Sequence, residues 1–311
     1  MAERSPGGSS LADAEEPQGS GTGKFDRDTA VWLLDDSGTE RTYRADVSPD
    51  WRAGRGPHGG YIAAMLLRAL VHAVDDSARA PRSLTVHYPR APEPGPVQIR
   101  TRIERAGRSL STLSARMEQD GRLTALVLAA FSPAWSGLEI DDVEMPQVAP
   151  PDPDPAFREP PHPALPPIAQ RTRLQRRFGG PPFSGAEQAM EIGGWLAHDE
   201  RRPLDALSLA FFADAVIPAP FMRLPAPNAA PTIDLSVHFR AALPHFSADR
   251  AGGQSDGGAG AAGDELCLLQ IRTSLIHEGF FEEDGLMWAP DGTLLAQSRQ
   301  LAILLPMTGG S

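Results

Sequence analysis

The sequence predicts an α+β fold made of two tandem copies, each a long helix packed on an antiparallel sheet. One observation is the order of elements in the first half, where one apolar-striped helix precedes a run of alternating strands and hairpin turns. A second is an internal repeat, which carries the same motifs in the same order through the second half. A third is the length of 311 residues, which gives room for two domains of ordinary size.

The composition excludes several classes of partner and site. The formal net charge of -11 at pH 7 argues against nucleic acid as a partner, because its binding proteins present a basic surface. The one cysteine, Cys267, cannot form an internal disulfide or a cysteine-rich metal site, and we expect no metal and no cofactor. Met1–Gly23 lacks the apolar core of a signal peptide, and no apolar run is long enough to span a bilayer. We therefore expect a cytoplasmic protein that binds no membrane.

The N-terminal copy is expected at residues 25–143, after a disordered tail at residues 1–24 whose composition cannot form a core. Its helix carries a stripe of apolar residues at helical spacing, and its later strands alternate between apolar and polar residues. The elements in order are strands at Thr29–Leu34 and Thr39–Ala45, a helix at Tyr61–Val74, and strands at Ser83–Tyr88, Val97–Arg105, Leu110–Gln119 and Leu123–Phe131.

Two glycines, Gly59 and Gly60, stand at the start of this helix and follow His58. Glycine lets another group approach the backbone closely, and the free N–H groups of a helix start favour a negative or partly negative oxygen. A flexible turn is the simpler interpretation of a Gly-Gly pair alone.

A proline-dense linker at residues 144–168 leads to the C-terminal copy, which we expect at residues 169–307. The repeat places the same motifs in both copies at a nearly constant offset. The matches are LTVHYPRA at Leu84–Ala91 with LSVHFRAA at Leu235–Ala242, QIRT at Gln98–Thr101 and Gln270–Thr273 (270 − 98 = 172), and the Asp-Gly turns Asp120-Gly121 and Asp291-Gly292 (291 − 120 = 171).

The offset is smaller for the first motif, 235 − 84 = 151, so the C-terminal copy carries an insertion. We assign it to Ser247–Asp264, a Gly-rich segment expected to form a flexible surface loop. The repeat also exposes an asymmetry. At the 171 offset, Gln300 matches Ala129, so a carboxamide in the C-terminal copy replaces a small residue.

Asp214 is the most unusual residue of the second half. Leu207, Ala210 and Phe211 precede it by seven, four and three residues, so a helix would place it on an apolar face, where an ionised carboxylate is costly. Either Asp214 caps a helix end or reaches solvent, or it is a catalytic carboxylate. Counting from the equivalent histidines His87 and His238 places it near the start of the main helix of the C-terminal copy, and we adopt that position.

Several motifs resemble the double hot-dog acyl-CoA thioesterases, in particular the acyl-CoA thioesterase II group. They are GPHGGY in the first half and FFADAVIP, PTIDLSVHFR and DGTLLAQSRQ in the second. The resemblance implies the hot-dog fold and acyl-CoA as substrate. It also implies three catalytic residues: Asp214 on the helix, Thr232 at the start of the next strand, and Gln300 on the last strand. The glycine pair Gly59 and Gly60, with His58, is expected to bind substrate.

This chemistry needs no metal and no nucleophilic Ser–His pair. Asp214 would accept a proton from a water held by Thr232 and Gln300, and helix-start N–H groups would polarise the thioester carbonyl. Strict alternation places Thr232 on the same strand face as Asp234 and on the other face from Leu235. However, Thr232 is the first residue of the strand after Pro231, where regular pleating need not hold.

Other interpretations stay open at this point. The fold can serve a non-catalytic acyl-binding or scaffold protein, and hot-dog sheets pair edge to edge, so both a homo-oligomer and a monomer are compatible with the sequence. His87 and His238 are equivalent in the two copies, which favours a structural role. A group of arginines can meet the phosphates of coenzyme A or form a solvated strand face: Arg171, Arg173, Arg176 and Arg177.

Overall fold

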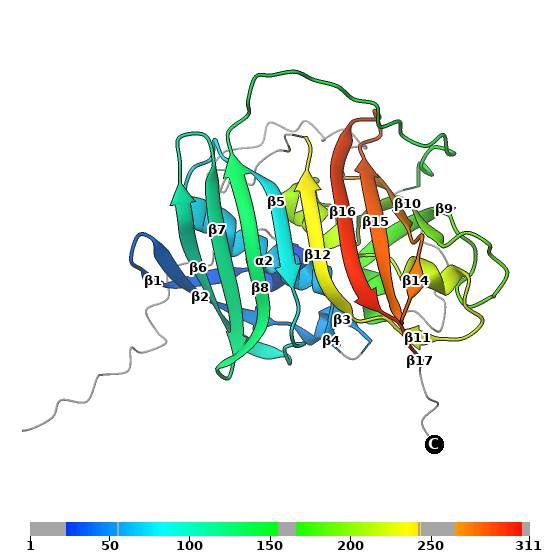
Figure 1. The fold of residues 1–311 in the computed structure, drawn as a ribbon, viewed down its shortest axis with the longest axis horizontal. Helices are drawn as coiled ribbons and strands as arrows, with labels where there is room; N and C mark the ends of the chain where they lie inside the picture. Colours follow the sequence, from blue (N-terminus) through cyan, green and yellow to red (C-terminus); the bar gives the residue numbers. More distant parts are fainter. Residues whose placement is uncertain (1–22, 55, 155–165, 242, 244–264, 307–311) are drawn as a thin grey trace, which may run out of the picture.

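In the computed structural model, which describes residues 23–54, 56–154, 166–241, 243 and 265–306, thirteen strands form one antiparallel sheet (Figure 1). The strand order is β1-β2-β6-β7-β8-β5-β12-β16-β15-β13-β10-β9, with β14 paired to β15. The two copies therefore lie side by side and share one sheet. The predicted tail, apart from its last two residues, and the predicted insertion Ser247–Asp264 lie outside the described residues.

The N-terminal copy follows the predicted order of elements. Its helix α2 begins at Gly59 and ends at Val74, where Asp75 adopts a left-handed conformation, and the Asp120-Gly121 turn has positive φ at both residues. Its elements are α1 (Lys24–Asp28), β1 (Val31–Asp36), β2 (Glu40–Val47), a 3-10 turn η1 (Pro49–Trp51), β3 (Arg52–Ala53), β4 (Gly56–Pro57), α2 (Gly59–Val74), β5 (Ala80–His87), β6 (Gly95–Ala106), β7 (Ser111–Gln119) and β8 (Arg122–Ser132).

The C-terminal copy repeats this plan with a shorter helix. Its elements are η2 (Pro167–Arg171), β9 (Thr172–Phe178), β10 (Glu191–His198), α3 (Ala206–Phe212), η3 (Ala219–Met222), β11 (Asn228–Ala229), β12 (Thr232–Phe239), β13 (Cys267–Arg272), β14 (Ile276–His277), β15 (Phe280–Trp288), β16 (Leu294–Ile303) and β17 (Leu305–Pro306). Of the helices in the described ranges, none combines the length and apolar character needed to cross a bilayer.

The prediction of a long helix in each copy is wrong for the C-terminal copy, because α3 has only 7 residues. The Asp205 side chain caps its start by accepting a hydrogen bond from Ser208 N at 2.8 Å. The helix cannot continue far beyond Phe212, because Pro218 and Pro220 lack the backbone N–H of a helix interior. Pro218 also disfavours the helical conformation of the preceding residue, Ile217.

The two copies join where β5 pairs with β12. Thr85 lies opposite Ser236, and their hydroxyls share a hydrogen bond of 3.0 Å. These two residues are equivalent in the repeat, since 236 − 85 equals the offset of 151 between the LTVH and LSVH motifs. A pseudo-two-fold axis therefore passes between them.

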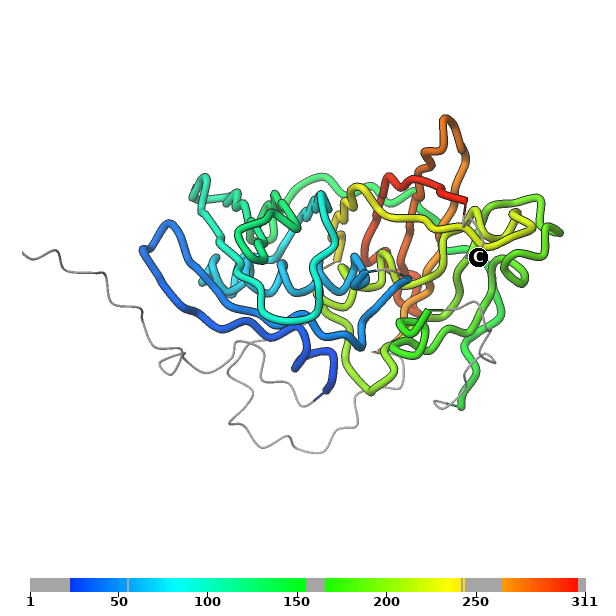
Figure 2. The backbone as a smooth tube through the Cα atoms, turned by 90° about the horizontal axis from the view of Figure 1, so that it is seen from below, coloured from blue at the N-terminus to red at the C-terminus, as the bar shows by residue number. Residues whose placement is uncertain are grey.

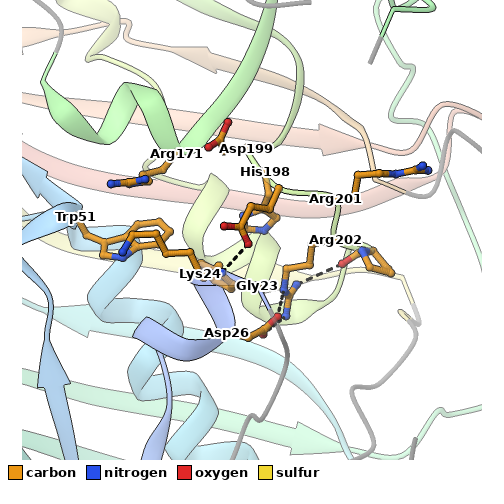
Figure 3. A pocket seen from close by; sticks show the side chains of 12 residues that line it. Gly23, Lys24, Asp26, Trp51, Arg171, His198, Asp199, Arg201 and Arg202 are labelled. Atoms are coloured by element: carbon orange, nitrogen blue, oxygen red, sulfur yellow. Dashed lines mark hydrogen bonds and ion pairs between the residues drawn. The ribbon is translucent and has the colours of Figure 1, made fainter. Parts of the chain in front are cut away.

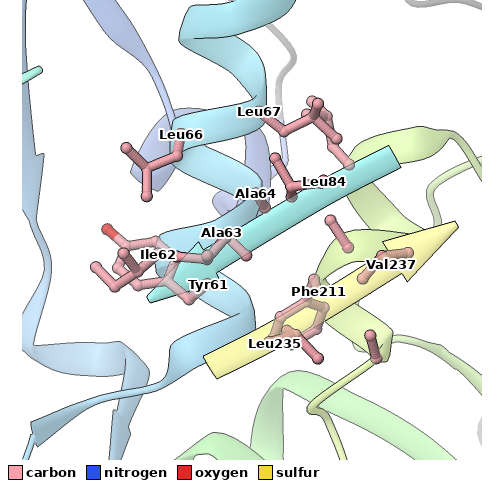
Figure 4. Close-up of a cluster of buried hydrophobic side chains, with 14 of the residues drawn as sticks. Tyr61, Ile62, Ala63, Ala64, Leu66, Leu67, Leu84, Phe211, Leu235 and Val237 are labelled. Carbon is pink, nitrogen blue, oxygen red and sulfur yellow. The ribbon is translucent and has the colours of Figure 1, made fainter. Parts of the chain in front are cut away.

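The core continues across this axis. Leu84 lies opposite Val237, and Leu235 lies opposite Val86, and all four side chains are buried. Figure 4 shows Leu84, Leu235 and Val237 facing residues of α2 and Phe211 of α3. Figure 2 shows α2 enclosed by the sheet, which curls at β1 and β2 around the helix. Because one apolar cluster contains residues of both copies, neither helix has a separate core.

The described residues of the proline-rich linker bind to the C-terminal copy by hydrogen bonds and apolar contacts. Arg177 donates to the carbonyls of Ala149 and Pro150, and Trp195 Nε1 also donates to Ala149 O. The linker residues Met145 and Val148 pack on a small apolar cluster of Trp195, Leu268 and Trp288.

A buried network of ion pairs connects α1 with α2 and with the start of α3. The Arg202 guanidinium binds Asp26 at 3.0 Å and Asp205 at 2.7 Å, and Arg68 of α2 binds Asp26 at 2.9 Å. Burial alone would lower the pKa of Arg202, but these carboxylates outweigh it and raise that pKa. Burial, together with the charge of Arg202, lowers the pKa of the adjacent His198 to about 3, so this imidazole is neutral at physiological pH.

We predict that Arg202→Met destabilises the fold by about 3 kcal/mol or more, since it leaves the buried carboxylate of Asp205 without its arginine partner and leaves Asp26 with Arg68 alone. The neighbouring Arg201 provides a matched control, because its side chain is 70% exposed and binds Glu265 at the surface. Arg201→Met should cost less than about 1 kcal/mol. Urea unfolding of the two variants measures the difference, and equal midpoints would contradict the role assigned to the network.

Candidate active site

Asp214 lies just after the end of α3, two residues beyond Phe212, and its side chain is 15% exposed. The predicted position near the start of a helix is therefore wrong. The repeat count misplaced Asp214 because α3 is shorter than α2 and turns follow it directly. The Asp214 carboxylate points at the start of α2, in the other copy.

The glycine pair allows this approach. A Cβ atom at Gly60 would lie 2.4 Å from the carbonyl oxygen of Phe211, and one at Gly59 would lie 2.9 Å from Asp214 Oδ2. Gly60 N donates to Asp214 Oδ2 at 3.0 Å, so the negative oxygen expected at this helix start belongs to the protein itself. The other first-turn N–H groups, of Tyr61 and Ile62, bind His58, and among the described residues no acceptor bonds the Gly59 N–H.

His58 is buried beside the glycine pair. It caps α2 by accepting a hydrogen bond from Tyr61 N at Nδ1, which leaves the proton on Nε2. Nε2 then donates to the backbone carbonyl of Asp214 at 2.6 Å, and it also lies 3.4 Å from Asp214 Oδ2. His58 therefore fixes Asp214 against the helix.

Tyr88, at the end of β5, closes the same region from the other side. Its hydroxyl donates to Gly59 O at 2.9 Å. Burial raises the pKa of the Tyr88 phenol, and the nearby charges of Asp214 and Asp234 raise it further. The phenol therefore remains protonated and keeps donating.

Thr232 and Gln300 meet through an irregularity of the sheet. Regular alternation would turn Thr232 away from Leu235, but the pairing of β12 with β16 shifts register between Thr232 and Asp234. Thr232 consequently lies opposite Ala302, on the face that carries Gln300, and its hydroxyl donates to Gln300 Oε1 at 3.2 Å.

The repeat assigned Gln300 to the position of Ala129, and the strand register agrees. Gln300 pairs with Leu235 just as Ala129 pairs with the equivalent Leu84. Gln300 is 6% exposed and faces the core, where the N-terminal copy has only a methyl group.

Glu283 on β15 completes this cluster, although it was not among the residues predicted from the sequence. It lies directly opposite Gln300 and is 4% exposed. One carboxylate oxygen accepts from Gln300 Nε2, and the other accepts from Ala219 N at 2.6 Å. Burial raises the pKa of Glu283 to about 7, aided by the charges of Asp214 and Glu282 and opposed by those two hydrogen bonds.

Two signals in the sequence could have identified Glu283 and Tyr88 as residues of the site. Glu283 shares the inward face of its strand with Phe281 and Met287, and a carboxylate at such a position needs an explanation. Tyr88 is equivalent to Phe239 in the repeat, so its hydroxyl is present in one copy only.

The structure thus joins Thr232, Gln300 and Glu283 by direct hydrogen bonds, and it joins Asp214 to Gly60 and His58. Within the described part of the chain, Asp214 makes no hydrogen bond to Thr232 or Gln300, so no direct bond links the two groups. They are related through Glu283, which binds Gln300 and lies within the field of Asp214.

A cavity of about 250 Å³ lies elsewhere, at α1 and the end of β10, and Figure 3 shows it. None of the residues predicted to be catalytic or to bind substrate beside the helix start lines it. Arg171, one of the arginines considered for the phosphates of coenzyme A, does line it, and it binds the backbone carbonyl and the carboxylate of Asp50. The basic side chains of the cavity bind carboxylates of the protein, as Lys24 does with Asp28 and Asp50, and Arg201 with Glu265. Its electrostatics are therefore those of a structural ion-pair region.

The remaining candidate residues are accounted for by the fold. Arg173 and Arg176 are partly buried and donate to the carbonyls of His198 and Gly180, so these two do not form the solvated strand face that was one of the two interpretations of this group. Burial raises the pKa of the Cys267 thiol to about 12, which makes it a poor nucleophile. His87 and His238 lie exposed on the paired strands β5 and β12.

Comparison with known protein families matches both halves of the chain. Residues 47–132 match the acyl-CoA thioesterase N-terminal domain, and residues 144–304 match the acyl-CoA thioesterase C-terminal domain. No curated protein is found to match by sequence.

Several solved structures share the architecture. A conserved protein of unknown function with a hot dog fold from Alicyclobacillus acidocaldarius is 26% identical, with a TM-score of 0.75, 92% of this chain covered and 100% of the other. A putative thioesterase II from Thermobifida fusca YX is 22% identical, with a TM-score of 0.70 and coverages of 91% and 98%. The acyl-CoA thioesterase II TesB2 from Mycobacterium marinum is 19% identical, with a TM-score of 0.64 and coverages of 89% and 97%.

The family matches cover both repeated units, and the similar structures align with about nine-tenths of the chain. The chain therefore belongs to the acyl-CoA thioesterase family and has the hot-dog fold.

Proposed function

We propose that the protein hydrolyses an acyl-CoA thioester to a free acid and coenzyme A, using a water activated by Asp214, Thr232 and Gln300. The observation that carries the proposal is the contact of Asp214, from the C-terminal copy, with Gly60 N at 3.0 Å at the helix start of the N-terminal copy. The hydrogen-bonded group of Thr232, Gln300 and Glu283 lies within the electrostatic field of the same carboxylate. Water adds to the thioester carbon, the C–S bond breaks, and the coenzyme A thiolate takes up the proton that Asp214 accepted from the water.

Each residue has a separate role in this proposal. Asp214 is the general base, held by the N–H of Gly60 and by His58. Thr232 and Gln300 hold the water, since their hydrogen bond fixes both side chains in one geometry. The Gly59 N–H, directed by the helix start, polarises the thioester carbonyl oxygen, while Gly60 is already engaged by Asp214.

We further propose that the protein acts in the cytoplasm and in lipid metabolism. A single buried cysteine, Cys267, fits a reducing compartment. The second candidate function is acyl-CoA binding without hydrolysis on the same fold. Binding alone would not require a carboxylate, a hydroxyl and a carboxamide at positions where the other copy has small or apolar residues, as Ala129 illustrates for Gln300.

Wild-type protein should release free thiol from at least one member of a panel of acyl-CoAs with different chain lengths. Asp214→Asn keeps the shape of the side chain and removes the base, so it should lower kcat by about 10²–10⁴-fold and leave acyl-CoA binding nearly unchanged. Single-turnover hydrolysis and equilibrium binding measure the two quantities. The control is Asp284→Asn, which removes an exposed carboxylate from β15 and should keep the wild-type rate.

Two results would contradict this proposal. Folded wild-type protein that binds acyl-CoA and releases no thiol from any chain length would favour the binding function. Full activity in Asp214→Asn would show that the proposed base is not needed.

Thr232 and Gln300 should behave as one unit. Thr232→Val and Gln300→Ala should each lower kcat by less than Asp214→Asn, because the other partner still orients the water. The double variant should lose less activity than the product of the two single losses, with a coupling energy of about 0.5–3 kcal/mol. A double-mutant cycle on kcat measures this coupling, and strictly multiplicative losses would show that the two side chains act separately.

A further inference from the structure

Glu283 is a buried carboxylate that the proposed reaction does not yet use. It lies on β15 between the two parts of the site: one oxygen accepts from Gln300 Nε2, and the other accepts from Ala219 N, five residues after Asp214 along the chain. It therefore connects the strand that carries Gln300 to the segment that follows Asp214.

The hydrogen-bond pattern around Glu283 sets the orientation of the Gln300 side chain. An ionised carboxylate can only accept, so the amide nitrogen of Gln300 must face Glu283 and its oxygen must face Thr232. Thr232 then donates its hydroxyl proton to Gln300 and keeps its oxygen lone pairs free. The second N–H of Gln300 remains free to donate to a water, and Thr232 remains free to accept from it.

This is the pattern that a nucleophilic water requires. The water donates one proton to Asp214 and the other to Thr232, accepts one hydrogen bond from Gln300, and keeps a lone pair for the thioester carbon. With the amide reversed, Gln300 Nε2 would face Thr232, and the hydroxyl proton of Thr232 would be free to compete for the lone pair of the water.

We propose that Glu283 is a positioning residue of this site, which acts through Gln300 by holding its amide in the orientation that prepares the water. The inference rests on the proposed hydrolytic function. In this proposal Glu283 does not act on the reacting atoms directly: one of its oxygens accepts from Gln300 Nε2 and the other from Ala219 N.

The protonation state of Glu283 should then control the site. When protonated, Glu283 still has to accept from Ala219 N, so its proton lies on the oxygen that faces Gln300 and reverses the amide. The charged groups that act on it are Asp214 after α3 and Glu282 on β15, both negative, and both favour the protonated form. The pKa of about 7 places the change in the physiological range, and the active orientation belongs to the ionised form above that value.

The variant Glu283→Gln tests the proposal, because its amide must donate to Gln300 at every pH and so mimics the protonated acid. It should lower kcat by about 10²-fold with little change in KM, the cost of a misplaced reacting group. It should also abolish the rise of wild-type kcat with pH that is centred near 7. The exposed neighbour Asp284→Asn is the control and should keep both the rate and the pH profile.

The double variant Glu283→Gln/Gln300→Ala separates positioning from a structural role. If Glu283 acts through Gln300, the double variant should match Gln300→Ala within about twofold. A further loss of the full factor seen for Glu283→Gln alone would overturn the proposal.

A readout that needs no activity keeps the two proposals distinguishable. The side-chain ¹⁵N amide signals of Gln300 in wild-type protein, assigned against Gln300→Ala, should shift with pH with a midpoint near 7. Absence of thiol release with this titration present would reject the proposed function alone. Active wild-type protein whose Gln300 signals do not titrate, or a Glu283→Gln variant with wild-type kcat, would reject the role of Glu283.

Discussion

The antiparallel pairing of β5 with β12 is the constraint on which the rest of the structure depends. It makes one sheet from two copies and places the start of α2 against the end of α3, so that Gly60 meets the backbone of Phe211. Without that contact, Asp214 would have no helix start to bind. The site is therefore a product of the interface between the copies, and each copy supplies a different part of it.

The division of labour follows from small differences at equivalent positions. In the N-terminal copy, Leu113 and Ala129 lie opposite each other on β7 and β8, and in the C-terminal copy Glu283 and Gln300 take those places. Burying two polar side chains where the other copy buries apolar ones costs free energy unless they bind each other. Their hydrogen bond, with that from Ala219 N, supplies this compensation.

The repeated motifs and the alternation of the strands were sufficient to predict the duplicated fold, the helix at Tyr61–Val74 and the equivalence of Gln300 with Ala129. They could not predict the length of α3. Asp205 fixes its start, whereas His58 caps α2, and Pro218 and Pro220 prevent the helix from continuing. The motifs and the alternation also could not predict the face of Thr232, which depends on a bulge, or the role of Glu283. The constant offset of 171 pairs Glu283 with the polar Thr112, whereas the strand register pairs it with Leu113.

The pseudo-two-fold axis between Thr85 and Ser236 has a consequence for how such a site can diverge. In a symmetric dimer of identical chains, every substitution appears twice, so a buried carboxylate introduced on one side is also introduced on the other. Covalent fusion of the two copies removes that restriction. One half can retain an apolar interior that maintains stability, while the other half accumulates the buried polar and titratable groups that chemistry requires.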